Sequence, residues 1–195
     1  MTVSANDQVW LASHSFICAL LKLKREHGFW FTGNQSWNLM KWNACGSVMI
    51  SKEAISQFIN NPTVTKGSKA SEYGGGAGAR CFVAEHIYPS KQLKTLILKK
   101  FEDCDPTLEE LKALFSNFNR ICYVWHEEDK RLTSLGLRSS SPVGSELEDL
   151  YARYEAAGIS AVPTNFSHGR HLFKHLEACR SDHFDAAQIV RNISQ

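Results

Sequence analysis

A carboxylate and a histidine stand next to each other at Glu85 and His86, directly after the apolar residues 81–84. Histidine has an unperturbed pKa of about 6.5, so it can take a proton from water near neutral pH. A carboxylate beside it can bind a divalent cation through oxygen. A second apolar segment leads into three further acids, Glu127, Glu128 and Asp129. This combination indicates metal-assisted hydrolysis, in which a neutral base and oxygen ligands are held on a rigid frame.

Two segments of the chain resemble the HNH, or ββα-metal, nucleases. Residues 84–89, Ala-Glu-His-Ile-Tyr-Pro, resemble the acid-histidine start of that motif, and residues 121–132 resemble its second strand and metal-bearing helix. By this resemblance His86 activates water and Glu85 is a metal ligand. An acid on the helix, best Asp129, is a further ligand, with Glu128 next to it. The usual final histidine of the motif is absent, and an aspartate stands in its place.

The resemblance also implies a fold and a reaction. The fold is α+β, a helix-rich single domain around a ββα-metal-like hairpin-helix core, in which Asn119 is the candidate for the middle asparagine that braces the loop between the strands. The reaction is endonuclease hydrolysis of DNA with a divalent metal, Mg²⁺ or Mn²⁺. Residues 149–159 resemble restriction-endonuclease-like sequences, which suggests a role in restriction or phage defence. The resemblance spans residues 81–159.

Two other interpretations fit the same region. Glu128 and Lys130 form the E-x-K pattern of the PD-(D/E)XK nucleases, with Asp105 or Glu85 as the upstream acid. In that arrangement the lysine positions water and the acids bind magnesium. The other interpretation is a non-catalytic module that binds nucleic acid or protein, in which the acid-histidine pair is structural and the acids near Glu128 complement a helix dipole.

Basic side chains supply candidate phosphate contacts, although the net charge is only +2. Lys66 and Lys69 lie in residues 62–80, a stretch rich in glycine, serine and threonine that is predicted to be a flexible loop with almost nothing to bury. Lys130 and Arg153 are the other two candidates, and a salt bridge to the aspartate four residues earlier explains Arg153 equally well. Duplex DNA is the expected partner, in preference to RNA, and the chain is a candidate homodimer.

Two further groups of residues invite a binding interpretation. His171, His175 and Cys179 fall on one helical face, but three ligands spread over two turns span about 12 Å, too far for a single zinc ion. A solvated or helix-capping histidine cluster is the alternative. The aromatic residues of 29–42 offer rings that either stack on bases or pack in a core.

Periodicity and capping residues predict the elements that position these side chains. Helices are expected at residues 8–25, after a cap at Ser51, from Ser90, and after a capping box at Thr107 and Glu110. Strands are expected at residues 81–84 and 119–125, paired antiparallel, with a helix from residue 126 folded back across them. A helix over 146–157 ended by Gly158, a strand at 159–162 and helices from about residue 169 complete the prediction.

Composition limits what the chain can be. With 195 residues, 43% of them apolar and 22% charged, it has the composition of one folded domain. The expected parts are a helical part at 1–61, the loop at 62–80, a nuclease-like core at 81–159 and a helical part at 160–195. Six cysteines without a C-x-x-C pair argue against a zinc ribbon or a secreted disulfide framework. No apolar run has the length of a membrane span, so a cytoplasmic protein is expected.

Overall fold

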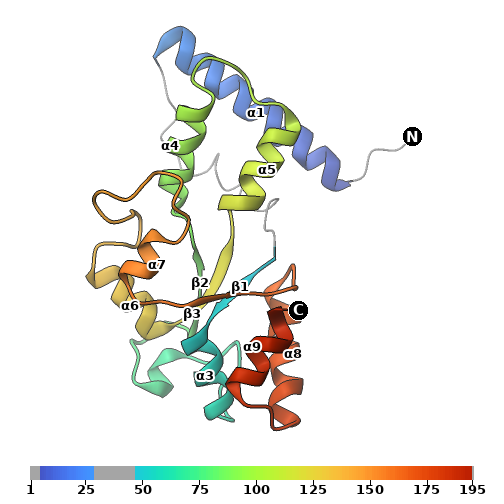
Figure 1. Cartoon of the computed structure of the whole chain (residues 1–195), viewed down its shortest axis with the longest axis vertical. Helices are drawn as coiled ribbons and strands as arrows, with labels where there is room; N and C mark the ends of the chain where they lie inside the picture. Colours follow the sequence, from blue (N-terminus) through green and yellow to red (C-terminus); the bar gives the residue numbers. More distant parts are fainter. Residues whose placement is uncertain (1–4, 29–46, 195) are drawn as a thin grey trace.

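Four short strands form one mixed sheet near the middle of the molecule (Figure 1). They are β1 (Met49–Ser51), β2 (Phe82–His86), β3 (Ile121–Trp125) and β4 (Ala161–Pro163), in the spatial order β2-β3-β1-β4. β1 runs parallel to β3, whereas the β2–β3 and β1–β4 pairs are antiparallel. The computed structural model describes residues 5–28 and 47–194. Within these ranges eight α-helices accompany the sheet, so the chain is a mixed α+β domain.

One face of the sheet, here called the α8 face, is covered by α3 (Lys52–Asn60), α8 (Gly169–Ser181) and α9 (Ala186–Ser194). The apolar side chains of these helices pack against Phe82 and Trp125 of β2 and β3. Ring contacts join Phe173 of α8 to Phe82 at 4.9 Å and to Phe58 of α3 at 5.8 Å between centroids. This aromatic cluster fixes α3 and α8 on the sheet.

The opposite side, here called the α6 face, is covered by α6 (His126–Ser134) and α7 (Ala152–Ala156). Leu132 of α6 and Tyr154 of α7 pack with Cys122 and Val124 of β3, and all four side chains are buried. α6 begins directly after β3 and also contacts β2. The chain therefore does fold back across the two strands after Trp125, as the sequence predicts.

Three helices form a separate apolar cluster at one end of the molecule, beyond the ends of the strands (Figure 1). They are α1 (Ala5–His27), α4 (Ser90–Lys100) and α5 (Leu108–Phe118), and the last two are inserted between β2 and β3. α5 opens with the predicted capping box. Thr107 Oγ1 accepts from the Glu110 backbone N at 3.2 Å, and the Glu110 carboxylate accepts from the Thr107 backbone N at 2.8 Å.

Several local predictions are confirmed. Ser51 Oγ caps α3 by accepting from Ala54 N at 3.0 Å. Gly158 follows α7 with a φ of 63°, the left-handed conformation that favours glycine. The predicted antiparallel pairing places Glu85 opposite Cys122. β1 is not apparent in the sequence, because a buried run of three residues carries no usable periodicity.

The helix predicted over residues 146–157 is wrong at its start. α7 covers only Ala152–Ala156, and turns precede it. Asp149 explains the shortening, since its Oδ1 accepts hydrogen bonds from the backbone N of Tyr151 at 3.1 Å and of Ala152 at 3.0 Å. An aspartate that bonds the backbone ahead of it favours a non-helical conformation at its own position. These local hydrogen bonds outweigh the helical spacing of Leu147 and Leu150.

Residues 62–80 run over the surface, as expected of a loop, but they are built more firmly than predicted. They contain the 3₁₀ helix η1 (Ala70–Tyr73), and Val64 and Ala70 are fully buried. Backbone hydrogen bonds of 2.8 Å from Ala70 N to Ala79 O and 3.0 Å from Cys81 N to Ser68 O close the loop on itself. The expectation that this segment has almost nothing to bury is therefore wrong.

The described helices and cysteines bear on the expectations about membrane spans and disulfides. None of the described helices is both long enough and apolar enough to cross a membrane. The five described cysteines are free thiols, while Cys45 and the aromatic residues of 29–42 lie outside the described residues.

Candidate functional site

Glu85 lies on the α6 face of β2, because it stands opposite Cys122 and residues paired across a ladder share a face. Its Oε2 accepts a hydrogen bond from Arg153 Nη2 at 3.3 Å, and its side chain is 14% exposed. Burial raises the pKa of Glu85; the charge of Arg153 opposes this rise, and the charge of Asp129 adds to it. Glu85 is thus a mostly buried carboxylate held between a cation and a second acid.

Asp129 is the second acid; it lies in the first turn of α6, and its charge raises the pKa of Glu85. Negative side chains are favoured in a first helical turn, which explains why an acid is tolerated here beside another. Asp129 Oδ1 is buried and has no hydrogen-bond partner among the described residues. A buried acceptor without a donor costs about 1–3 kcal/mol. The charge of Asp129 therefore acts on Glu85, and one oxygen of Asp129 is left unsatisfied.

This pair fits a hard divalent cation. Mg²⁺ is usually bound by one or two carboxylates, with waters and substrate phosphate oxygens in its other positions. Glu85 and Asp129 supply two carboxylates, and Asp129 Oδ1 has no competing donor in the described part of the chain. A larger protein ligand set is absent there, since no group of three or more His, Cys, Asp or Glu side chains could hold an ion.

Arg153 has a structural role that could not be predicted from the sequence. Only 1% of it is exposed, although it is a charged side chain. Its nitrogens donate to the Glu85 carboxylate and to the backbone carbonyl oxygens of His86, Ile87, Leu137 and Arg138. A guanidinium enclosed in this way cannot reach DNA, so the prediction of Arg153 as a phosphate contact is wrong. The alternative pairing with Asp149 is also wrong, because Arg153 pairs with Glu85 and Asp149 accepts from the backbone N of Tyr151 and Ala152 instead.

His86 lies on the α8 face, since neighbouring residues of a strand point to opposite sides. It is the last residue of β2 and is partly buried. The expected convergence of Glu85, His86 and Asp129 on one point is therefore not found. The prediction ended this strand at residue 84, but pairing continues through His86 and imposes the alternation. β2 is nevertheless the outer strand of the described sheet, so Glu85 and His86 flank the same free edge.

The other predicted acid, Glu128, is used by a helix cap. Its Oε2 accepts from Trp125 N at 2.9 Å and from the Ser51 hydroxyl. Burial raises the pKa of Glu128, and these hydrogen bonds oppose the rise. Its role as a metal ligand is therefore not supported. Lys130 is exposed and pairs with Glu127 at 2.7 Å, so the E-x-K arrangement is not assembled either.

Asn119 ends α5 just before β3 and is 2% exposed. Its Nδ2 is buried without a hydrogen-bond partner among the described residues. The next residue, Arg120, accepts at its carbonyl oxygen from Ile87 N at 3.0 Å, which continues the β2–β3 ladder past His86. Asn119 thus lies close to the strand ends, where the resemblance to HNH nucleases expects it.

The two lysines of residues 62–80 are in different surroundings. Lys69 is exposed, and its backbone forms an isolated bridge with Arg80. Lys66 is partly buried, and its Nζ lies 5.3 Å from the centroid of the Tyr123 ring. Only Lys66 therefore lies over the sheet.

The C-terminal histidines and Cys179 do not gather around one point. Cys179 Sγ is 3.4 Å from His175 Nε2, whereas His171 is exposed. His168 caps α8, with its Nδ1 accepting from Arg170 N at 3.1 Å. The capping interpretation is therefore the better one for this segment.

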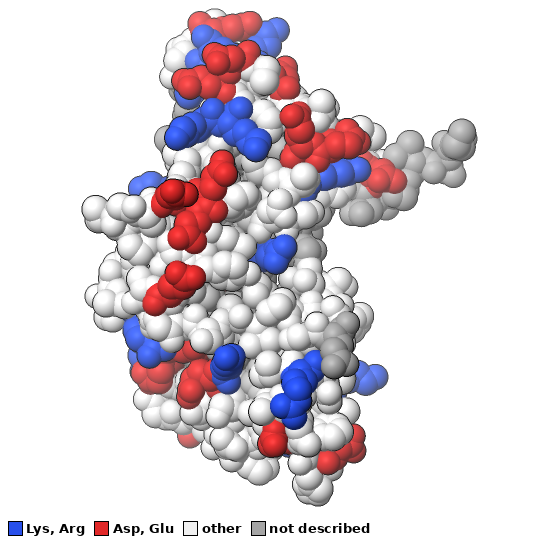
Figure 2. Space-filling model, viewed as in Figure 1, with Lys and Arg blue, Asp and Glu red and all other residues white. Residues whose placement is uncertain are grey.

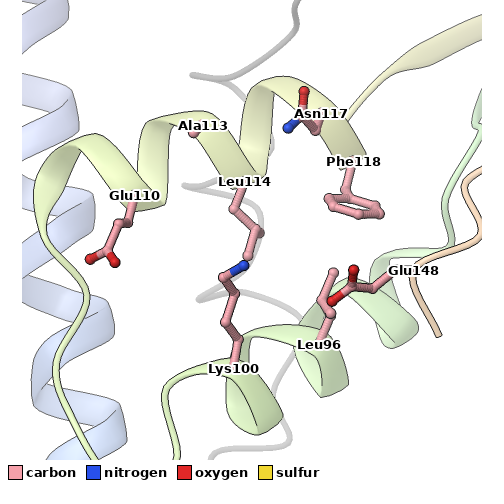
Figure 3. Close-up of a pocket in the computed structure, with 8 residues that line it drawn as sticks. All are labelled: Leu96, Lys100, Glu110, Ala113, Leu114, Asn117, Phe118 and Glu148. Carbon is pink, nitrogen blue, oxygen red and sulfur yellow. The ribbon is translucent and has the colours of Figure 1, made fainter.

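A pocket of about 220 Å³ lies apart from these residues, between α4 and α5 (Figure 3). Leu96 and Lys100 line it from α4, Leu114 and Phe118 from α5, and Glu148 from the segment before α7. Apolar side chains and charges of both signs share its wall, and none of the predicted site residues is among them. It is not part of the candidate site.

Comparison with protein-family models, with curated protein sequences and with solved structures gives no significant match to this chain.

Proposed function

We propose that this chain is a metal-dependent endonuclease that hydrolyses DNA phosphodiester bonds at the free edge of β2. The observation that carries the proposal is Asp129 Oδ1, which is buried and without a donor in the described residues, in the first turn of α6 and near enough to Glu85 of β2 for its charge to raise the pKa of that carboxyl. A restriction or phage-defence role is the context that the resemblance to HNH nucleases implies. Mg²⁺, or Mn²⁺ in its place, is the proposed metal.

The proposed division of labour follows the two faces of the edge strand. Glu85 and Asp129 would hold the metal on the α6 face, and the metal would supply charge neutralisation for the phosphoryl oxygens. His86 takes a proton from the attacking water on the α8 face. Both residues belong to the end of β2, the outer strand of the described sheet, so the proposal places the phosphate at this strand end, with Glu85 on one side and His86 on the other. Arg153 positions the strand end by holding the carbonyl oxygens of His86 and Ile87.

Cleavage of supercoiled plasmid with Mg²⁺ or Mn²⁺ tests the proposal, with EDTA as the blank. Glu85→Gln and Asp129→Asn keep the shape of each side chain and remove its charge. We expect both to lose cleavage while the thermal midpoint shows that the fold is retained. Glu127→Gln is the matched control, because Glu127 is an exposed acid in the same helical turn as Asp129. Wild-type protein that cuts in EDTA, or an Asp129→Asn variant that cuts normally, contradicts the proposal.

A second candidate is a non-catalytic nucleic-acid-binding module. It is favoured by the separation of His86 from the acid pair and by Arg153, which already supplies a positive charge beside Glu85. This candidate predicts that the protein retards labelled duplex DNA in a gel without cutting it in any metal. Binding without cleavage therefore selects the second candidate, and cleavage that depends on Glu85 and Asp129 selects the first.

A further inference from the structure

Three cations from different parts of the sequence gather on the α8 face. Lys66 is the central one, with its Nζ 5.3 Å from the Tyr123 ring centroid and 5.7 Å from that of Phe173. Contacts of an ammonium with ring faces hold its alkyl stem on the sheet and are worth about 0.5–1 kcal/mol at exposed sites. The position of this charge is therefore set by packing and not by an acidic partner.

Arg170 belongs to the first turn of α8, and its charge lowers the pKa of Lys66. Gly169, the residue before it, lies so close to Tyr123 that an added Cβ would be 2.1 Å from the hydroxyl oxygen. This contact fixes the start of α8 against β3 and places Arg170 beside the ring over which Lys66 lies. The positive end of the α8 dipole adds to the charge at this point.

Arg80 completes the group from the end of the loop. Its Nη1 donates to the carbonyl oxygen of Gly67 at 3.3 Å, next to Lys66 in sequence. Arg80 is also bridged through its backbone to Lys69. The fold of residues 62–80 thus brings Arg80 back to the start of the same loop.

No acid balances these three charges in the part of the chain that the structure describes. None of Lys66, Arg80 and Arg170 makes an ion pair there within the usual 4.0 Å limit. Burial lowers the pKa of Lys66, and the positive charges of Arg170 and Arg80 lower it further. Like charges held this close raise the free energy of the protein until an anion binds among them.

The cluster is also on the face that carries His86. Tyr123 stands opposite Ala84 in the ladder, and His86 is two residues further along the same side of β2, about 7 Å away at strand spacing. Ala84 is exposed, so this part of the sheet is open to solvent. Figure 2 shows side chains of both signs of charge on the face that it draws, with no continuous basic surface there.

We propose that Lys66, Arg80 and Arg170 form a binding site for a phosphate group of a nucleic-acid backbone, adjacent to the edge of β2. The choice of nucleic acid as the source of the phosphate rests on the proposed function, whereas the preference for phosphate rests on the cluster alone. The sequence pointed to Lys66 with Lys69, but the fold replaces Lys69 by two arginines. Neither arginine stands out in the sequence, because they come from residues 80 and 170.

The test uses a double variant that combines Lys66→Met and Arg170→Gln. The single variant Lys69→Met is its control. Methionine keeps the apolar stem that packs on Tyr123, so loss of charge is separated from loss of packing. Binding of a labelled DNA duplex, carrying phosphorothioates so that it is not cut, is measured over a series of salt concentrations. Because the three cations share one phosphate group, we expect the double variant to flatten the log-log salt dependence by about 0.9, the value for one phosphate contact, and Lys69→Met to leave it unchanged.

Titration with inorganic pyrophosphate, followed by NMR, separates this site from the nuclease proposal. Pyrophosphate that binds the wild type and not the double variant, in a protein that does not bind DNA, supports the site and removes nucleic acid as its partner. DNA cleavage with an unchanged salt dependence in a folded double variant overturns the site and leaves the nuclease proposal standing. Should the double variant not fold, Lys66→Met and Arg170→Gln are measured singly, and each is expected to flatten the salt dependence by part of the value of about 0.9 for one phosphate.

Discussion

Arg153 Nη2 donates a hydrogen bond of 3.3 Å to Glu85 Oε2 and a second one to the carbonyl oxygen of His86, so one buried guanidinium holds both residues of the acid-histidine pair. The side chain binds the acid through its carboxylate and the histidine through its backbone. The end of β2 is therefore fixed by a residue that lies far along the chain, on α7.

Replacement of Arg153 by methionine tests this relationship. The variant leaves Glu85 mostly buried without its cation and leaves several carbonyl oxygens without a donor. Removal of one partner of a buried ion pair costs about 3–5 kcal/mol, and we expect the free energy of unfolding in urea to fall by about that amount. Arg138→Gln is the control, because Arg138 is exposed, and a change within about 0.5 kcal/mol is expected there. Equal stabilities of the two variants would show that Arg153 is not the clamp described.

His86→Ala addresses catalysis at the edge of β2. If His86 is the general base, its loss lowers the rate of plasmid nicking by about 10²–10⁴-fold, while the thermal midpoint changes little. Phosphate binding is expected to persist, because the cationic cluster is unchanged. A variant that melts with the wild type and cuts at the same rate excludes His86 from the reaction. Only the proposed metal binding by the two acids would then remain.

The pH dependence of stability tests the buried cap of α6. Burial raises the pKa of Glu128, so the folded state favours its protonated form. Its contribution is then fully present below the unfolded pKa and is lost as pH rises through the folded pKa. Glu128→Gln keeps an acceptor for Trp125 N and does not ionise, so its unfolding free energy should fall less with rising pH than that of the wild type. Parallel curves from acid to neutral pH, obtained by urea denaturation, contradict this expectation.

Gly169→Ala tests the contact that places Arg170. The new methyl group would lie 2.1 Å from the Tyr123 hydroxyl oxygen, so α8 must shift or the ring must move. Forced overpacking of this kind costs about 1–3 kcal/mol. Gly76→Ala is the matched control, since nothing lies within 4 Å of its added Cβ. We expect only Gly169→Ala to weaken both stability and phosphate binding.

The features that could be predicted from the sequence are those that depend on neighbours along the chain. The caps at Ser51 and Thr107, the stop at Gly158 and the β-rich run before α6 each involve residues within one helical turn. Strand pairing followed from two apolar segments that had to bury the same side. The face on which His86 lies could not be inferred from a strand predicted to end at residue 84, because side chains alternate between faces only within a strand.

The surroundings of the candidate site depend on distant residues. Nothing near Arg153 indicates that it donates to carbonyl oxygens of residues 86, 87, 137 and 138. The same holds for the cationic cluster, whose members converge only because residues 62–80 turn back on themselves and α8 packs on Tyr123. Charge and spacing alone favoured Lys69, which is exposed and close in sequence to Lys66.

The insertion of α4 and α5 between β2 and β3 affects how this chain folds. The two strands can pair only after the segment that contains α4 and α5 has been closed into a loop. The segment between β1 and its parallel partner β3 is longer still. Closing long loops costs entropy before any strand contact repays it, so contacts of this kind slow folding. The helical insertion packs with α1 in its own apolar cluster, and the backbone hydrogen bonds within each of its helices are local. We therefore expect helical signal to appear before the edge of β2 exists, and binding competence to be acquired last.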